Sequence, residues 1–173
     1  MATKAAELYD QDFYAWTQQQ AAALRTHFKG DNRLDVEHLA EEVEDLGKSD
    51  LQAVESYVQQ IITHLLKLDY SGFELPRRHW RSEITAFRTS MRRKLSPSIE
   101  RKVRAALPEL YDDARRMAAA SVDAEPDLGR RLPKRCPYDW SAIWHRDVMA
   151  EAGIDLSGGA EEGQKTRRRK RGA

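Results

Sequence analysis

Three polar residues, Glu42, His64 and Arg88, each lie beside a run of apolar residues that repeat at helical spacing. His64, for example, follows Ile61 by three residues and precedes Leu68 by four. Side chains in such places are partly buried, and a buried charged group needs a partner because an unpaired charge in a core costs several kcal/mol. We therefore predict a hydrogen-bonded network of these three residues that fixes the register of the helices. A catalytic or metal pocket is the alternative.

A metal site would draw on residue types that this chain carries. His38, His64, Glu42 and Asp35 are acceptable ligands for zinc, manganese or iron in a helical bundle. Di-iron bundles, however, use paired Glu-x-x-His motifs, and Asp35-x-x-His38 is only a single weak counterpart. A metal-dependent enzyme centred on His64 and Glu42 is therefore a lesser hypothesis, and the sequence assigns no metal and no cofactor.

The most basic part of the chain is the segment 77–104, which has ten Lys or Arg residues against two acidic residues. Nucleic-acid phosphate is one partner for such a segment. The candidate nucleic-acid-binding residues are Arg92, Arg93, Lys94, Arg101 and Lys102. The interleaved Trp80 and Phe87 fall on the apolar stripe, however, and the segment 35–55 offers eight carboxylates. Charge pairing within the molecule is therefore the other explanation of these basic residues.

Motifs of the common enzyme classes are missing from this sequence. It has no Gly-rich phosphate loop, nucleophile elbow, Cys-x-x-Cys pair or His-Glu-x-x-His helix. Helix packing and charged faces explain its features without an assembled site. The leading hypothesis is a non-enzymatic protein-interaction or regulatory module with a protein partner or a second copy of itself, and nucleic-acid binding is the runner-up.

Composition indicates one helical domain in a reducing compartment. The 173 residues, 40% of them hydrophobic, can bury one full-sized core, and 33% charged residues with 9 Gly and 6 Pro favour long helices over strands. No apolar run reaches the ~18 residues of a membrane span, and the N-terminus lacks a secretory signal. Cys136 is the single cysteine and cannot form an internal disulfide. We expect a soluble, cytoplasmic protein with no membrane partner.

The charges are unevenly distributed along the chain. Six of the 29 Lys and Arg residues lie in the last nine positions, which leaves 23 positive against 28 negative charges, a net −5, in the rest. From Gly153 onward, further glycines and this basic run predict disorder. We expect a helical domain over residues 1–152 and a disordered basic tail over residues 153–173 that would extend a nucleic-acid-binding surface.

The elements that must position these residues are about five to six amphipathic helices packed as an all-α bundle. The carboxylates of residues 10–12 can cap a first helix, which ends at the turn Gly30-Asp31-Asn32. A second helix begins after Asp35 and ends at Gly47, which suits the left-handed position after a helix. Its predicted core stripe is Val36, Leu39, Val43 and Leu46.

Further along, Ser49 or Asp50 can cap a third helix whose apolar residues repeat three and four apart through Leu68. The remaining patterns predict a fourth helix between Pro76 and Leu95 and a fifth that restarts at Ser96-Pro97-Ser98. At Pro108 the fifth should kink or divide into two abutting helices. A loop over 123–137 and a last short helix from Pro137 through Val148 follow.

Several blocks of residues, in a fixed order, resemble the DUF29 family, a bacterial domain of unknown function. The blocks are residues 9–16, 39–47 and 64–67, followed by Trp80, Arg88, Ser96-Pro97-Ser98, Leu107-Pro108, Tyr111, Ala114 and Cys136-Pro137-Tyr138. The resemblance covers roughly residues 9–148. It implies an all-helical fold, no assigned activity and no catalytic residues.

Overall fold

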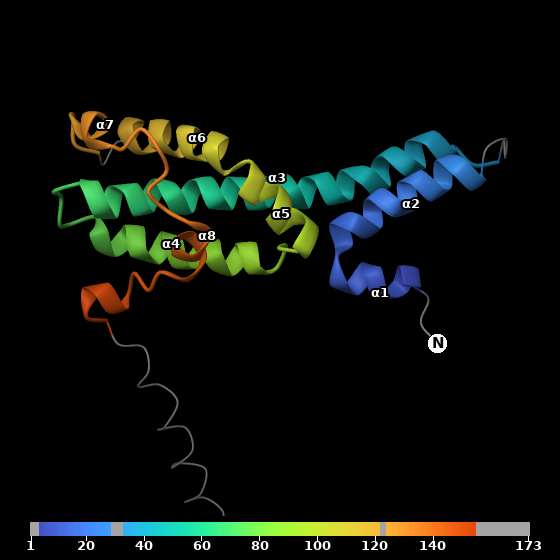
Figure 1. Cartoon of the computed structure of the whole chain (residues 1–173), viewed down its shortest axis with the longest axis horizontal. Helices are drawn as coiled ribbons and strands as arrows, with labels where there is room; N and C mark the ends of the chain where they lie inside the picture. Colours follow the sequence, from blue (N-terminus) through green and yellow to red (C-terminus); the bar gives the residue numbers. More distant parts are fainter. Residues whose placement is uncertain (1–3, 29–32, 122–123, 155–173) are drawn as a thin grey trace, which may run out of the picture.

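One long helix, α3, runs through the whole molecule. The computed structural model describes residues 4–28, 33–121 and 124–154, and within them α3 extends without a break from Val36 to Tyr70. Asp35 caps its first turn by accepting a hydrogen bond from the backbone N–H of His38 at 3.3 Å. The other helices pack along its two halves, as a body around the C-terminal half and an arm along the N-terminal half (Figure 1).

The predicted helix end at Gly47 is wrong, because Gly47 lies buried inside α3. A Cβ atom there would lie 2.2 Å from Oγ1 of Thr17 and 3.4 Å from Cδ2 of Tyr14, both on α2 (Phe13–His27). The missing side chain therefore lets α2 approach α3 closely. Glycine marks a helix contact here, and the predicted second and third helices are one.

The body consists of α4 (Arg77–Arg92) and α6 (Leu107–Ala120), which pack along the C-terminal half of α3, and α5 (Pro97–Ala105), which links them (Figure 1). Its core contains Val54, Val58, Ile61, Ile62, Leu65, Leu66, Trp80, Ile84, Met91, Ile99, Val103, Leu110, Tyr111 and Ala114. The apolar repeat predicted through Leu68 is confirmed as a core face of α3, and Trp80 is buried on α4 as expected.

Two predicted boundaries in the body are confirmed. Ser96 caps α5 by accepting a hydrogen bond from the backbone N–H of Ile99 at 3.5 Å, and Pro97 lies in the first turn, where a missing N–H costs nothing. The expected break at Pro108 takes the form of two abutting helices, because α6 begins at Leu107 directly after α5. Proline thus occupies an early turn of α6 instead of a helix interior.

The C-terminal segment returns across the body. It forms α7 (Leu128–Arg131) within the stretch predicted as loop, α8 (Trp140–His145) and a 3-10 turn, Ala150–Ala152. Asp139 caps α8 by accepting a hydrogen bond from the N–H of Ala142 at 2.7 Å. The last predicted helix is therefore confirmed over a shorter range, because it begins at Trp140 and ends at His145.

The arm consists of α2, the N-terminal half of α3 and a short helix α1 (Lys4–Gln11), which the sequence did not predict (Figure 1). The buried residues along its two long helices are Thr17 and Ala21 on α2 and Ala40 and Gly47 on α3. All four side chains are small. The arm therefore has a close helix contact but little apolar core of its own.

The stripe predicted as the core of the second helix is only partly buried at Val36 and Val43, and its two leucines are exposed. Leu39 and Leu46 expose 44% and 55% of their surface. The buried positions, Ala40 and Gly47, come one residue later, which is about 100° further round the helix. The apolar repeat was real, but α2 packs on a neighbouring face.

The fold class is confirmed as all-α. The described ranges contain helices and no strand, and no helix in them is long and apolar enough to cross a membrane. Most of the predicted disordered tail, from residue 155 on, lies outside the described residues, as does the whole of the predicted turn at residues 30–32.

Candidate functional site

The predicted network of Glu42, His64 and Arg88 does not form. Glu42 is exposed on the arm, whereas His64 is buried in the body 22 residues further along the same helix. At 1.5 Å per residue, about 33 Å separates their positions along the axis of α3. A catalytic or metal pocket built on both residues is therefore excluded. Among the described residues, no group of three or more His, Cys, Asp or Glu side chains could hold a metal ion.

His64 lies in the contact between α3 and α4. Its ring stacks on Phe87 with the centroids 6.1 Å apart, and His79 approaches edge-on at 6.4 Å. Only 8% of His64 is exposed. The prediction that His64 is partly buried is correct, and these ring contacts give it a packing role between two helices.

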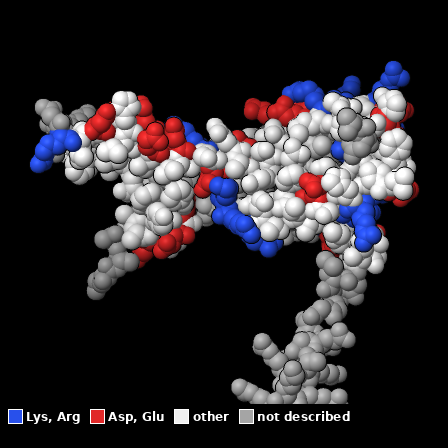
Figure 2. Space-filling model, turned by 180° about the vertical axis from the view of Figure 1, so that it is seen from behind, with Lys and Arg blue, Asp and Glu red and all other residues white. Residues whose placement is uncertain are grey.

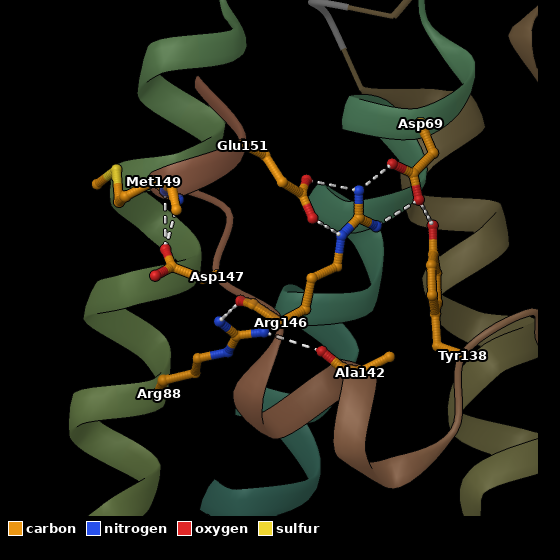
Figure 3. Close-up of polar contacts among 9 residues, drawn as sticks. Asp69, Arg88, Tyr138, Ala142, Arg146, Asp147, Met149 and Glu151 are labelled. Carbon is orange, nitrogen blue, oxygen red and sulfur yellow. Dashed lines mark hydrogen bonds and ion pairs between the residues drawn. The ribbon is translucent and has the colours of Figure 1, made fainter. Parts of the chain in front are cut away.

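Arg88 binds the C-terminal end of α8. Its guanidinium donates hydrogen bonds to the carbonyl oxygens of Ala142 at 3.0 Å, Ile143 at 2.8 Å and Arg146 at 2.6 Å. Figure 3 shows the bonds to Ala142 and Arg146. The last carbonyls of a helix have no partners within the helix and carry partial negative charge. Burial and the nearby positive charge of Arg146 lower the pKa of Arg88. Arg88 thus attaches the C-terminal segment to α4.

A second attachment, which the sequence did not reveal, is centred on Arg146. Its guanidinium makes two hydrogen bonds to Asp69, at 2.6 and 2.7 Å, and two to Glu151, at 2.8 and 2.9 Å (Figure 3). Tyr138 donates its hydroxyl hydrogen to Asp69 at 2.8 Å. These bonds join the last turn of α3 to both sides of α8, over a sequence distance that no local motif spans.

The electrostatics of this cluster favour its charged pairs. The hydrogen bonds with Asp69 and Glu151 raise the pKa of Arg146, and the bond from Arg146 lowers the pKa of Glu151. Burial and the neighbouring Asp69 carboxylate raise the pKa of Tyr138. Tyr138 therefore stays protonated as a hydrogen-bond donor, and the cluster holds structure instead of supplying a base.

A shallow cleft of about 380 Å³ lies beside these residues, between α4 and the segment after α8. Its cationic side chains already have partners. Arg88 and Arg146 are held as described above, and the guanidinium of Arg92 lies over the ring of Trp144, 5.8 Å from its centroid. The cleft thus offers no assembled catalytic group.

The candidate nucleic-acid-binding residues lie near the junction of α4 and α5. Lys94 pairs with Asp50 on α3, and the Lys102 ammonium lies 5.3 Å from the ring centroid of Tyr14. Arg101 donates a hydrogen bond to the Ser98 hydroxyl at 3.0 Å. The Lys94–Asp50 pair supports the charge pairing predicted between the basic segment and the acidic one.

That pairing is limited, because the acidic residues of the arm have a different partner. Arg25 of α2 donates hydrogen bonds to Glu37 at 2.9 Å and to Glu44 at 2.7 Å. The N-terminal half of α3 extends beyond α4, so most of its carboxylates cannot reach the basic segment. Arg92, Arg93, Arg101 and Lys102 remain exposed. Nucleic-acid binding stays a prediction.

Asp12 connects the base of the arm to the body. Its carboxylate accepts hydrogen bonds from the N–H of Ala15 at 3.1 Å, the hydroxyl of Ser96 at 2.9 Å and the N–H of Ser98 at 2.8 Å. One side chain therefore caps both α2 and α5. Burial acts to raise its pKa, but these hydrogen bonds outweigh burial, and the pKa of Asp12 lies below its usual value.

The exposed and partly exposed apolar side chains of the arm form the best candidate for a functional surface. Tyr9, Phe13 and Trp16 pack against one another with ring centroids 4.8 to 5.6 Å apart, and Tyr9 remains 49% exposed. With Leu39 and Leu46 they make up what we call the arm surface. Figure 2 shows an uncharged stretch along the arm, bordered by acidic side chains.

Comparison with known proteins places the chain in a family. The family described as "Domain of unknown function DUF29" matches residues 8–149. The chain belongs to the DUF29 family. The resemblance stated from residues 9–148 is thereby confirmed. The chain is also similar to a solved structure, an α-helical protein of unknown function from Rhodospirillum rubrum ATCC 11170. The two are 26% identical, with a TM-score of 0.66 and coverage of 84% of this chain and 94% of that chain.

No curated protein matches the chain significantly. Neither the family description nor that of the Rhodospirillum rubrum protein states an activity. The function of this DUF29 protein is thus uncharacterised.

Proposed function

We propose that this protein is a non-enzymatic interaction module that binds a protein partner through the arm surface. The observation that carries this proposal is the inverted distribution of side chains on the arm. Small residues, Ala40 and Gly47 among them, are buried, while Leu39 and Leu46 are exposed. If solvent surrounded this arm in the functional protein, its leucines would normally be buried between the two helices. Their exposure therefore indicates that another molecule covers them.

The polar residues support the same function, because their side chains already bind groups within the chain. Arg88, Arg146 and Asp12 each bind groups within the chain. Together with the separation of Glu42 from His64, this leaves the described residues without an assembled set of nucleophile, base and electrophilic group. Interaction through a shaped apolar surface needs no such set.

The proposal is tested by a pair of matched double variants. Leu39→Glu with Leu46→Glu places two charges on the arm surface. Phe73→Glu with Leu75→Glu places two charges on the loop between α3 and α4, where the side chains are 44% and 97% exposed. Each tagged protein is cross-linked in cytosol of its own host, and the co-purifying proteins are quantified by mass spectrometry.

We expect a partner at near-equal molar amount with the unchanged protein and with the loop variant, and its loss with the arm variant. A second copy of the chain counts as a partner in this measurement. Retention of every stoichiometric partner by the arm variant, or absence of any such partner from all three samples, would contradict the proposal. Circular dichroism of both variants checks that the helices are intact.

A further inference from the structure

The exposed leucines of the arm continue a helix face that is already an interface in the body. His64 and Tyr57 contact Phe87 of α4, with ring centroids 6.1 and 6.3 Å apart. Seven residues before Tyr57, Asp50 pairs with Lys94 just after α4 ends. Residues seven apart lie on nearly the same face of a helix. This face of α3 is therefore covered by α4 from residue 64 back to residue 50.

The same face extends N-terminally beyond the reach of α4. Leu46 comes four residues before Asp50, and Leu39 seven residues before Leu46, so both fall on this face. No helix in the described ranges covers it, and the two side chains are 55% and 44% exposed. This face of α3 therefore becomes uncovered where α4 ends, although the face itself stays apolar further toward the N-terminus.

The opposite flank of the arm is already filled by polar contacts. Arg25 of α2 bridges Glu37 and Glu44 of α3 along that side. On α2, Trp16 lies nine residues before Arg25, which is half a turn away on the helix. Trp16 therefore shares the leucine side of the arm. The arm thus has one polar flank and one apolar flank formed by both helices.

We infer that a second copy of this chain covers the apolar flank, with the two arms packed antiparallel about a twofold axis. This inference rests on the proposed function and names the partner. An antiparallel pairing centred between residues 42 and 43 brings Leu39 of each copy opposite Leu46 of the other. A twofold rotation places Leu39 of one copy against Leu46 of the other and the reverse. The surface is therefore self-complementary, as a symmetric dimer requires.

Charge complementarity supports the same arrangement. The pairing places residue 35 of one copy opposite residue 50 of the other. The exposed Asp35 at the tip of one arm then lies near the exposed Arg92 and Arg93 at the end of the other copy's α4. Opposite charges at both ends of an apolar contact fix its direction and register.

The C-terminal tail of the same chain would cover the apolar flank of the arm less well than a second copy would. Residues 155–173 contain one large apolar residue, Leu156, and their basic run consists of Lys and Arg. Such a segment has almost nothing to bury against leucines and a tryptophan. A two-helix hairpin from a second copy supplies two helices of matching apolar pattern.

The oligomeric state of the full chain tests this inference. Sedimentation velocity over about 1 to 200 µM should show a dimer for the unchanged protein. The Leu39→Glu/Leu46→Glu variant should raise the dimer dissociation constant at least about hundredfold, because burying carboxylates in an apolar contact is costly. The Phe73→Glu/Leu75→Glu variant carries the same added charge and should dimerise like the unchanged protein.

Cysteine pairing tests the direction and register. With Cys136 replaced by serine, a mixture of Leu39→Cys and Leu46→Cys proteins should form the mixed disulfide dimer several-fold faster than either protein alone forms its own. Along an antiparallel pair, two copies of residue 39 are offset by about seven residues, or about 10 Å. Equal or preferred self-pairing would overturn the antiparallel register.

The outcomes separate this inference from the function on which it rests. A monomer at every concentration, together with an arm-dependent partner in the host cytosol, overturns the dimer and leaves the interaction module standing. A dimer that persists in the arm variant also overturns the inference, because its contact lies elsewhere. A monomer with no arm-dependent partner overturns both.

Discussion

Gly47 offers the sharpest test of how the arm is built. We predict that Gly47→Ala lowers the free energy of unfolding by about 1–2 kcal/mol, although alanine is the better helix former by about 1 kcal/mol. The added Cβ would lie 2.2 Å from Oγ1 of Thr17, which donates a hydrogen bond to the Tyr14 carbonyl at 2.8 Å. Overpacking of this kind costs about 1–3 kcal/mol, and displacing the hydroxyl adds about 0.5–1.5 kcal/mol for the hydrogen bond.

The clash should disappear when its partner is removed. In a Thr17→Ala background the nearest remaining atom is the Cβ of residue 17, at 3.3 Å, which needs a shift of only a few tenths of an ångström. Gly47→Ala should then be neutral or stabilising by up to about 1 kcal/mol. The double-mutant cycle should therefore show a coupling of about 2 kcal/mol.

Urea unfolding followed by far-UV circular dichroism gives all four free energies. Ser49→Ala, an exposed substitution two residues away on α3, serves as the control and should change stability by less than about 0.5 kcal/mol. If Gly47 ended a helix in a left-handed conformation, alanine would cost about 1 kcal/mol in both backgrounds. Zero coupling would therefore refute the close contact of α2 with α3.

Two further predictions concern the polar attachments. Asp12→Asn should cost about 2–3 kcal/mol at pH 7, because charged hydrogen bonds to two helix caps are weakened. The pKa of Asp12 in the folded protein lies below its usual value, because its hydrogen bonds favour the carboxylate. The stabilisation is therefore fully present above that usual pKa and is lost as the pH falls through the folded pKa. Unfolding curves of variant and unchanged protein should therefore converge in acid, and a constant difference would argue against the carboxylate. Arg88→Met should cost about 2–4 kcal/mol and speed amide exchange in α8, with Arg88→Lys recovering less than half, whereas the exposed Arg78→Met should change little. Unchanged exchange in α8 would show that the three carbonyls do not depend on Arg88.

Local signals in the sequence determined much of this fold. The helix N-caps are one example, because a short oxygen-bearing side chain can accept hydrogen bonds from the free N–H groups at the start of a helix. Such caps are formed by Asp12, Ser96 and Asp139. Pro108 separates two helices because its ring removes a backbone donor. The apolar repeat from Leu51 through Leu68 was sufficient to predict the face of α3 that the body buries.

Tertiary structure alone decided which apolar face is covered and which polar groups meet. A helical repeat shows that one side of a helix is apolar, but the chain must fold before α2 covers Gly47 and leaves Leu46 in solvent. The sequence likewise does not distinguish a glycine at a helix end from a glycine at a close helix contact, because both positions disfavour a side chain. The pairing of Arg146 with Asp69 joins residues 77 positions apart, and no local spacing carries that information.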